Sequence, residues 1–99
     1  MVIEWLKFRV ASGVSELFIE ADRKIWTAFL SQCPGFRKKS VWVNPQDETE
    51  IVIVIKWNTR EDWSNVPKNL LEKTEKRFMK AIGKDTYEYL EQREYQVRE

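Results

Sequence analysis

The side chains that could do chemistry in this 99-residue chain are its five tryptophans, three tyrosines and scattered charged residues, because the chain contains no histidine. Ser-His-Asp and Cys-His catalysis, zinc sites that need histidine and His-ligated haem are therefore excluded. The acidic residues are dispersed, and those at 46–50 lack the glycine and regular oxygen spacing of a calcium-binding loop. We expect neither a metal nor another cofactor.

The charges of the chain nearly balance, with 17 Lys+Arg against 16 Asp+Glu. No overall field would then attract nucleic acid or an anionic membrane. The one basic cluster, Arg37-Lys38-Lys39, falls in a predicted strand, where neighbouring side chains alternate between faces. We interpret it as the solvated start of that strand, and we expect no nucleic-acid partner.

The N-terminal residues and the single cysteine bear on the cellular location. Residues 1–5 include no basic segment, and no stretch of the chain approaches the length of a membrane span. Cys33 cannot form an intrachain disulfide, which fits a reducing compartment. We therefore expect a cytoplasmic protein without a membrane anchor.

The hydrophobic pattern predicts the elements that must position these side chains. Apolar residues alternate in four segments and recur at helical spacing in two longer ones, and turn residues separate the segments. We expect Ser12 to cap the first helix and Thr59 to cap a short helix before the last one. The predicted elements are a strand at 2–10, a helix from 14, strands at 36–43 and 51–57, a helix from 67 to a stop at Gly83, and a strand at 87–97.

This order of strand, helix, strand, strand, helix, strand indicates one domain of the α+β class. It is the order of the ferredoxin-like βαββαβ fold, a four-stranded antiparallel sheet with two main helices on one face. The run of five β-branched residues at 51–55 has apolar side chains for both faces of its strand, and the helices cover only one. We therefore predict a homodimer in which two sheet faces pack together as a dimeric α/β barrel.

The motifs at Pro34-Gly35-Phe36, at Trp57 and at Thr59-Arg60-Glu61-Asp62-Trp63 carry a family resemblance. Together with the order of elements, they resemble the antibiotic biosynthesis monooxygenase superfamily of dimeric α+β barrels over nearly the whole chain. The segments at 5–8 and 93–97 are most similar to those of a small group of uncharacterised cyanobacterial members. The resemblance implies the fold and the dimer, and it is weakly specific for activity, since this fold hosts several reactions.

One activity of the superfamily, haem degradation, does not fit this sequence. Its haem-degrading members use an asparagine on the first strand, a tryptophan after the third strand and an iron-binding histidine on the last helix. The corresponding positions here are about Leu6, Val66 and Lys76. None of these three side chains supplies the required chemistry, so we do not expect a haem oxygenase.

Two classes of function remain, and both use an aromatic cavity. In the first, the protein oxidises a small aromatic or quinol-like molecule with O2 and without a cofactor, which needs an apolar pocket and a polar group that stabilises a substrate anion. In the second, the cavity or the dimer surface binds a small apolar ligand or a protein and performs no chemistry. The candidate residues are Trp26, Trp57, Trp63 and Tyr89 as walls, with Asn44 or Arg93 as the polar partner. Core packing and a surface ion pair are the competing roles of these residues.

Overall fold

The computed structural model describes residues 1–98 and contains four strands and a set of helical segments. Their order agrees with the order predicted from the sequence. The elements are β1 (Val2–Val10), α1 (Ser15–Ala21), η1 (Asp22–Thr27), α2 (Ala28–Leu30), β2 (Phe36–Asn44), β3 (Asp47–Trp57), α3 (Arg60–Ser64), α4 (Lys68–Ile82) and β4 (Tyr87–Gln96).

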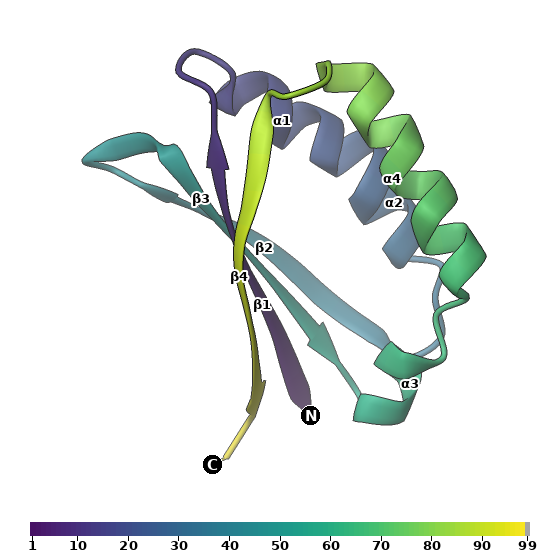
Figure 1. Cartoon of the computed structure of the whole chain (residues 1–99). Coiled ribbons are helices and arrows are strands. Elements are labelled where there is room, and N and C mark those ends of the chain that lie inside the picture. Colours follow the sequence, from purple (N-terminus) through teal and green to yellow (C-terminus); the bar gives the residue numbers. More distant parts are fainter. Residues whose placement is uncertain (99) are drawn as a thin grey trace.

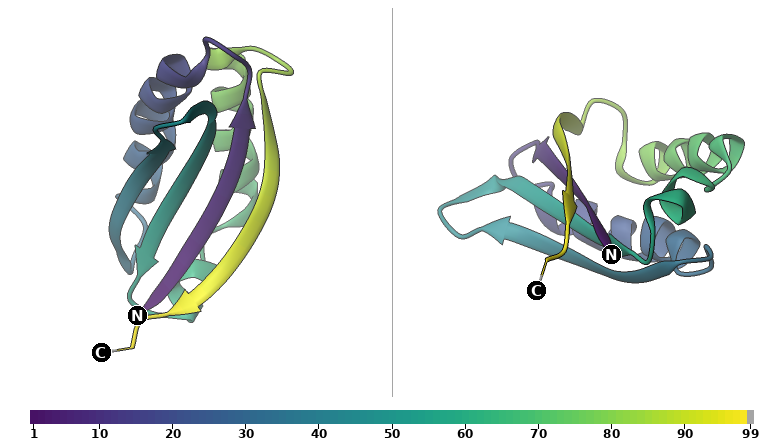
Figure 2. Two further views of the ribbon diagram at one scale, coloured as in Figure 1. Left: turned by 90° about the vertical axis from the view of Figure 1, so that its left-hand side faces the viewer. Right: turned by 90° about the horizontal axis from the view of Figure 1, so that it is seen from below.

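The strands form one antiparallel sheet in the order β2-β3-β1-β4, and the helices all lie on one of its faces (Figure 1). Seen from the other side, the sheet carries no helix, and β2 and β4 form its two edges (Figure 2). The predicted ferredoxin-like fold is confirmed. In a single copy the sheet is open rather than closed into a barrel.

Strand β3 supplies apolar side chains to both faces of the sheet. Ile51, Ile53 and Ile55 are buried beneath the helices. Val52 and Val54 alternate with them and therefore face the side without helices, where Val52 is 9% exposed. The helices account for the burial of the isoleucines, whereas the outer side owes its apolar character to these two valines and to aromatic residues on neighbouring strands.

The first helical segment begins differently from the prediction. Val14 occupies the N-cap position and makes no side-chain hydrogen bond there, so the expected cap by Ser12 was wrong. Instead the Glu48 carboxylate, which comes from β3, accepts hydrogen bonds from the Gly13 amide at 3.0 Å and the Ser15 hydroxyl at 3.5 Å. A carboxylate suits the positive end of a helix dipole, so a distant strand supplies the cap.

Elements α1, η1 and α2 form one continuous helical segment that changes winding in its middle. The turn at Asp22–Thr27 is a π-helix, in which backbone hydrogen bonds join residues five apart. This winding brings Asp22 and Thr27 onto the same side of the segment. A sequence pattern with a period of 3.6 residues does not reveal such a turn.

Two of the three motifs of the family resemblance, Pro34-Gly35-Phe36 and Thr59–Trp63, contact each other. Gly35 has a φ of +85°, and a Cβ at this position would overlap the Asp62 side chain of α3. Asp62 in turn donates its amide hydrogen bond to the Thr59 hydroxyl at 3.0 Å, which confirms the predicted cap. The Gly35 carbonyl also accepts a hydrogen bond from the Asn58 amide at 2.8 Å. Glycine is therefore required where the loop before β2 meets the start of α3.

Candidate functional site

A cavity of about 160 Å³ lies between the sheet and the helices. Its walls are mostly apolar and aromatic, and its volume is close to the roughly 150 Å³ of a protein cavity that binds benzene. The lining residues come from all four strands, from the helical segments that precede β2 and from those that follow β3. They are Glu4, Leu6, Phe8, Phe18, Asp22, Trp26, Leu30, Lys39, Ile53, Ile55, Trp57, Trp63, Val66, Leu71, Glu75, Phe78 and Tyr87.

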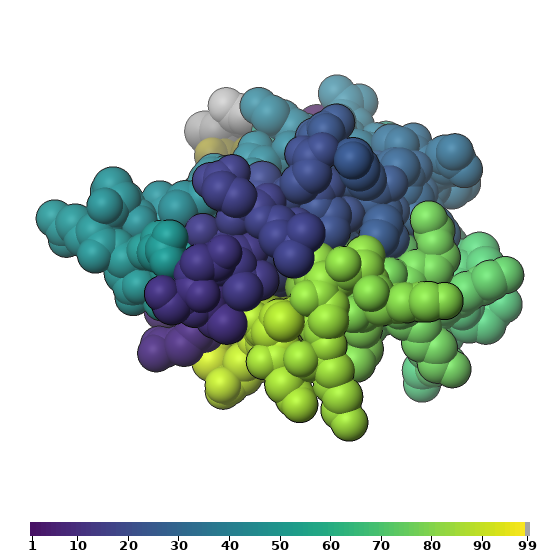
Figure 3. Space-filling model, turned by 90° about the horizontal axis from the view of Figure 1, so that it is seen from above, coloured from purple at the N-terminus to yellow at the C-terminus, as the bar shows by residue number. Residues whose placement is uncertain are grey.

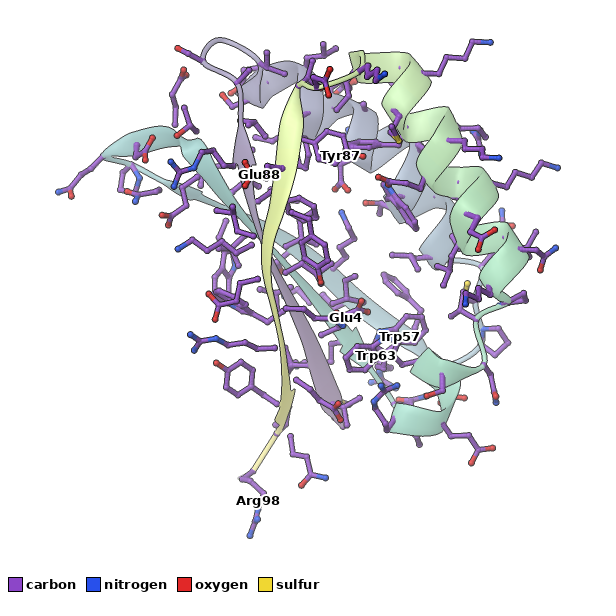
Figure 4. The ribbon with its side chains drawn as sticks, in the orientation of Figure 1. Glu4, Trp57, Trp63, Tyr87, Glu88 and Arg98 are labelled. Carbon is purple, nitrogen blue, oxygen red and sulfur yellow. The ribbon has the colours of Figure 1, made fainter. Side chains whose placement is uncertain are left out.

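Glu4 is the first polar group of the cavity. It lies on β1 at a helix-facing position, and the Trp57 indole Nε1 donates a hydrogen bond to its Oε1 at 3.1 Å. Figure 4 shows Glu4, Trp57 and Trp63 gathered on the helix side of the sheet near α3. Burial raises the pKa of the Glu4 carboxyl, although the Trp57 hydrogen bond and the Arg60 charge oppose the shift. A carboxylate held this way is suited to accepting a proton from a bound molecule.

A buried ion pair forms a second polar group. Lys39 on β2 contacts Asp22, and its ammonium also donates a hydrogen bond to the Thr27 hydroxyl at 2.9 Å. The Lys39 and Asp22 side chains are only 3% and 2% exposed. Burial raises the pKa of Asp22 despite the neighbouring Lys39 charge. Since the π-helical turn places Asp22 and Thr27 on one side, both can reach the same ammonium.

Tyr87 and Glu75 form a third polar group at the opposite end of the cavity from Trp57 (Figure 4). The Tyr87 hydroxyl on β4 donates a hydrogen bond to the Glu75 carboxylate on α4. Burial, this hydrogen bond and the Glu75 charge raise the pKa of the Tyr87 phenol. Tyr87 therefore remains protonated and links β4 to α4, while its ring packs against Phe18 and Phe78.

Three of the six predicted site residues line the cavity. Trp26 lies on the π-helical turn, Trp57 ends β3 and Trp63 lies on α3, so three separate elements bring the indole rings to one space. The Arg60 guanidinium covers the Trp63 ring at 3.8 Å from its centroid. Trp57 is almost fully buried and packs edge-on against Phe36. The Trp57 and Trp63 rings therefore pack against neighbouring side chains in addition to lining the cavity.

The other three predicted residues lie outside the cavity. Asn44 belongs to the β2–β3 hairpin, where its side-chain oxygen accepts a hydrogen bond from the Gln46 amide at 2.9 Å. This hairpin protrudes from the body of the molecule (Figure 3). Tyr89 is 51% exposed at the sheet edge, and its ring stacks on Phe8. Arg93 is exposed on the outer side of the sheet and pairs with Glu91. Neither Asn44 nor Arg93 is a polar partner in this cavity.

The polar groups that do face the cavity were missed in the sequence. Glu4 was not among the predicted site residues. Alternation along β1 nevertheless places it on the same face as Val2, Leu6, Phe8 and Val10. An acidic residue on an otherwise apolar strand face was the signal that could have identified it. The interpretation of Lys39 as solvated was wrong, because Asp22 and Thr27 compensate its burial.

Two features are absent from the described residues 1–98, namely a side-chain group suited to a metal ion and a helix suited to spanning a membrane. No three acidic or cysteine side chains of this part of the chain are grouped so that they could hold a metal ion. Among the same residues, no helix combines the length and the apolar character needed to cross a bilayer.

The chain matches one protein family and is similar in fold to solved structures. The model of the antibiotic biosynthesis monooxygenase family matches residues 1–66. Many solved structures are similar, and two examples match over nearly the whole chain. SnoaB of Streptomyces nogalater, a cofactor-independent oxygenase, is 16% identical with a TM-score of 0.76, covering 99% of this chain and 93% of SnoaB. The ActVA-Orf6 monooxygenase of Streptomyces coelicolor, in complex with nanaomycin D, is 12% identical with a TM-score of 0.75, covering 99% and 88%. No curated protein sequence matches the chain.

Proposed function

The chain belongs to the antibiotic biosynthesis monooxygenase family, and we propose that its cavity binds a small aromatic or quinol-like molecule and promotes its oxidation by O2 without a metal or flavin. The observation that carries the proposal is the Glu4 carboxylate, which faces an aromatic cavity and has a raised pKa. The description of SnoaB as a cofactor-independent oxygenase supports the same class of reaction.

Glu4 would act as the proton acceptor in this reaction. A quinol becomes reactive toward O2 when it loses a hydroxyl proton, because the resulting anion gives up electrons more readily. A partly buried carboxylate within reach of a ring hydroxyl can take that proton, and the Trp57 indole holds the carboxylate in place. The mostly aromatic and aliphatic walls would shield the reacting ring from much of the solvent.

The net reaction can be written for the simplest quinol. Hydroquinone and O2 give hydroxyquinone and one water molecule, so that one oxygen atom forms a new bond to a ring carbon. The O–O bond breaks, and the second oxygen atom leaves as water with two hydrogens from the quinol. The quinol supplies all four electrons, and no other reductant is needed.

Oxygen uptake with a panel of mono- and dihydroxylated aromatic molecules tests the proposal. We expect uptake above the buffer rate for at least one quinol, and its loss in Glu4→Gln. Glu50→Gln on the outer side of the sheet serves as the matched control and should retain the rate. Binding of quinols without any oxygen uptake would contradict the proposal and favour the alternative, a dimer that binds a small ligand and does no chemistry.

We also propose that two copies associate through the outer side of the sheet. An apolar area there includes Trp5, Trp42, Val52, Val54 and Tyr95, and Trp42 is 55% exposed in the single copy. Exposed aromatic side chains on a sheet face without helices favour an interaction site there. Sedimentation at micromolar concentration should show twice the monomer mass, and Trp42→Glu should reduce it to that of the monomer. A monomeric wild-type protein of 11.9 kDa would contradict this assembly.

A further inference from the structure

Glu4 and Lys39 lie in the same row across the helix-facing side of the sheet. Strand pairing places Glu4 of β1 opposite Ile55 of β3, and it places Lys39 of β2 opposite the same Ile55. Two strand spacings therefore separate the backbones of Glu4 and Lys39, about 10 Å in all. All three residues line the cavity, with Ile55 as an apolar floor between the two charged residues.

The Lys39 ammonium has capacity for one further partner. Two of its three N–H groups have partners within residues 1–98, namely the Asp22 carboxylate and the Thr27 hydroxyl. These two bonds fix the ammonium, since Asp22 and Thr27 come from one side of the π-helical turn. The third N–H is thus the one left for a molecule in the cavity.

We infer that Lys39 is the second ligand-binding group of the cavity, and that the ligand is a single aromatic ring with oxygens at opposite ends, lying over Ile55. One oxygen, a hydroxyl, donates to Glu4, and the other accepts from Lys39. A cavity of about 160 Å³ is suited to one ring of benzene size. This inference rests on the proposed function and narrows its substrate class.

The arrangement also gives Lys39 a role in stabilising charge. When Glu4 takes the proton from one oxygen, conjugation through the ring spreads the negative charge to the oxygen at the opposite end. An ammonium already fixed at that end stabilises the anion without having to reorganise. The carboxylate of Asp22 keeps the ammonium buried when the cavity holds no ligand.

The test uses 4-nitrophenol, which carries a hydroxyl and oxygen acceptors at opposite ends and changes colour on ionisation, with phenol as the one-ended probe. We expect wild-type protein to bind 4-nitrophenol about ten- to a hundredfold more tightly than Lys39→Met does, since a hydrogen bond to a charged group is lost. The affinity for phenol should change less than about threefold. Bound 4-nitrophenol should also ionise at higher pH in the variant than in the wild type.

Further variants separate this effect from general damage to the fold. Asp22→Asn combined with Lys39→Met removes both charges of the pair, so it leaves no unpaired buried carboxylate and should fold even if the single variant does not. The other ionisable groups facing the cavity, Glu4, Glu75 and Tyr87, are unchanged in both. Lys7→Met, on the outer side of the sheet, should behave as wild type.

The possible results distinguish this inference from the proposed function. If phenol binds and Glu4→Gln weakens it, but the folded Lys39 variants keep the full preference for 4-nitrophenol and its ionisation, the inference about Lys39 is overturned and the role of Glu4 stands. If neither probe binds the wild-type protein, the proposed function fails and the inference fails with it. Loss of the preference in the folded double variant supports the inference.

Discussion

The two faces of the sheet use charged residues in different ways. On the helix-facing side, Glu4 and Lys39 lie among apolar side chains, where Trp57 and Asp22 satisfy them. On the outer side, pairs such as Lys7 with Glu50 stay about one-third exposed beside apolar residues. Both faces are made by the same strands, so local sequence preferences do not explain the difference.

The free-energy cost of keeping a charged residue differs between the two faces. Surface ion pairs such as the one at Lys7 contribute about 0–1 kcal/mol to stability and cost little to maintain. Burying a charge is unfavourable unless it is paired, and replacing a buried pair by apolar residues is often neutral or stabilising. Charges kept on the inner face are therefore better explained by binding or chemistry than by stability.

The largest expected effect is on catalysis by the inner face. Glu4→Gln keeps the size of the side chain and removes its ability to accept a proton. We expect turnover of a quinol to fall about 100- to 10,000-fold, as is typical when a general base is lost. Steady-state oxygen uptake measures the change. Equal turnover by Glu4→Gln and wild type would remove the functional distinction between the two faces.

Two tryptophans on opposite faces provide the next comparison. Trp57→Ala empties a fully buried position and should lower the free energy of unfolding by about 3–5 kcal/mol. Trp42→Ala removes a largely exposed ring and should cost less than about 1 kcal/mol in the monomer. Urea unfolding at a concentration where monomers dominate measures both. Similar losses for the two variants would show that the faces are equally buried in a single copy.

Two lysines provide a comparison of charges. Lys39→Met leaves the buried Asp22 carboxylate unpaired and should destabilise the protein by about 3–5 kcal/mol. Lys7→Met breaks a pair that spans 3.7 Å at the surface, and the expected loss is below about 1 kcal/mol. Thermal unfolding measures both. A small loss for Lys39→Met would mean that this ion pair is open to water.

The smallest effect concerns pH. Because burial raises the pKa of Glu4 above its ordinary value of 4.5, the folded state holds this proton more tightly than the unfolded chain. Its stabilising contribution is present below pH 4.5 and is lost as pH rises through the raised value. Glu4→Gln should therefore gain stability relative to wild type across that interval.

Asp47 provides the control of opposite sign. Hydrogen bonds from Thr49 lower the pKa of this hairpin carboxyl, so its contribution is present above the ordinary value and is lost as pH falls. Asp47→Asn should lose stability relative to wild type as pH rises. Urea unfolding from pH 3 to 7 compares the two variants, and equal slopes for both would contradict the assigned shift of Glu4.

Much of the fold could be predicted because it depends on patterns that extend over many residues. Alternation identified the strands, and the Thr59 cap and the stop at Gly83 marked helix ends. Local patterns failed where a distant residue decides the structure. Ser12 was expected to cap the first helix, but Glu48 of the hairpin takes that role.

The site was less predictable, because its polar groups depend on tertiary pairing. Aromatic residues are conspicuous in a sequence, and three of the four chosen aromatic residues line the cavity. Lys39 appeared solvated because nothing nearby in the sequence reveals its partner, and the π-helical turn that presents Asp22 and Thr27 has no signature in the hydrophobic period. Only Glu4 left a local signal, as an acid on an apolar strand face.

Incubation of the wild-type protein with hydroquinone under ¹⁸O2 tests the central claim most directly. Mass spectrometry of the product and a parallel assay for hydrogen peroxide follow the two atoms of O2. We predict hydroxyquinone with one labelled oxygen, one O2 consumed per product, no accumulation of peroxide, and loss of the labelled product in Glu4→Gln. Hydroquinone that binds in the cavity yet yields no labelled product beyond the protein-free control would contradict the claim.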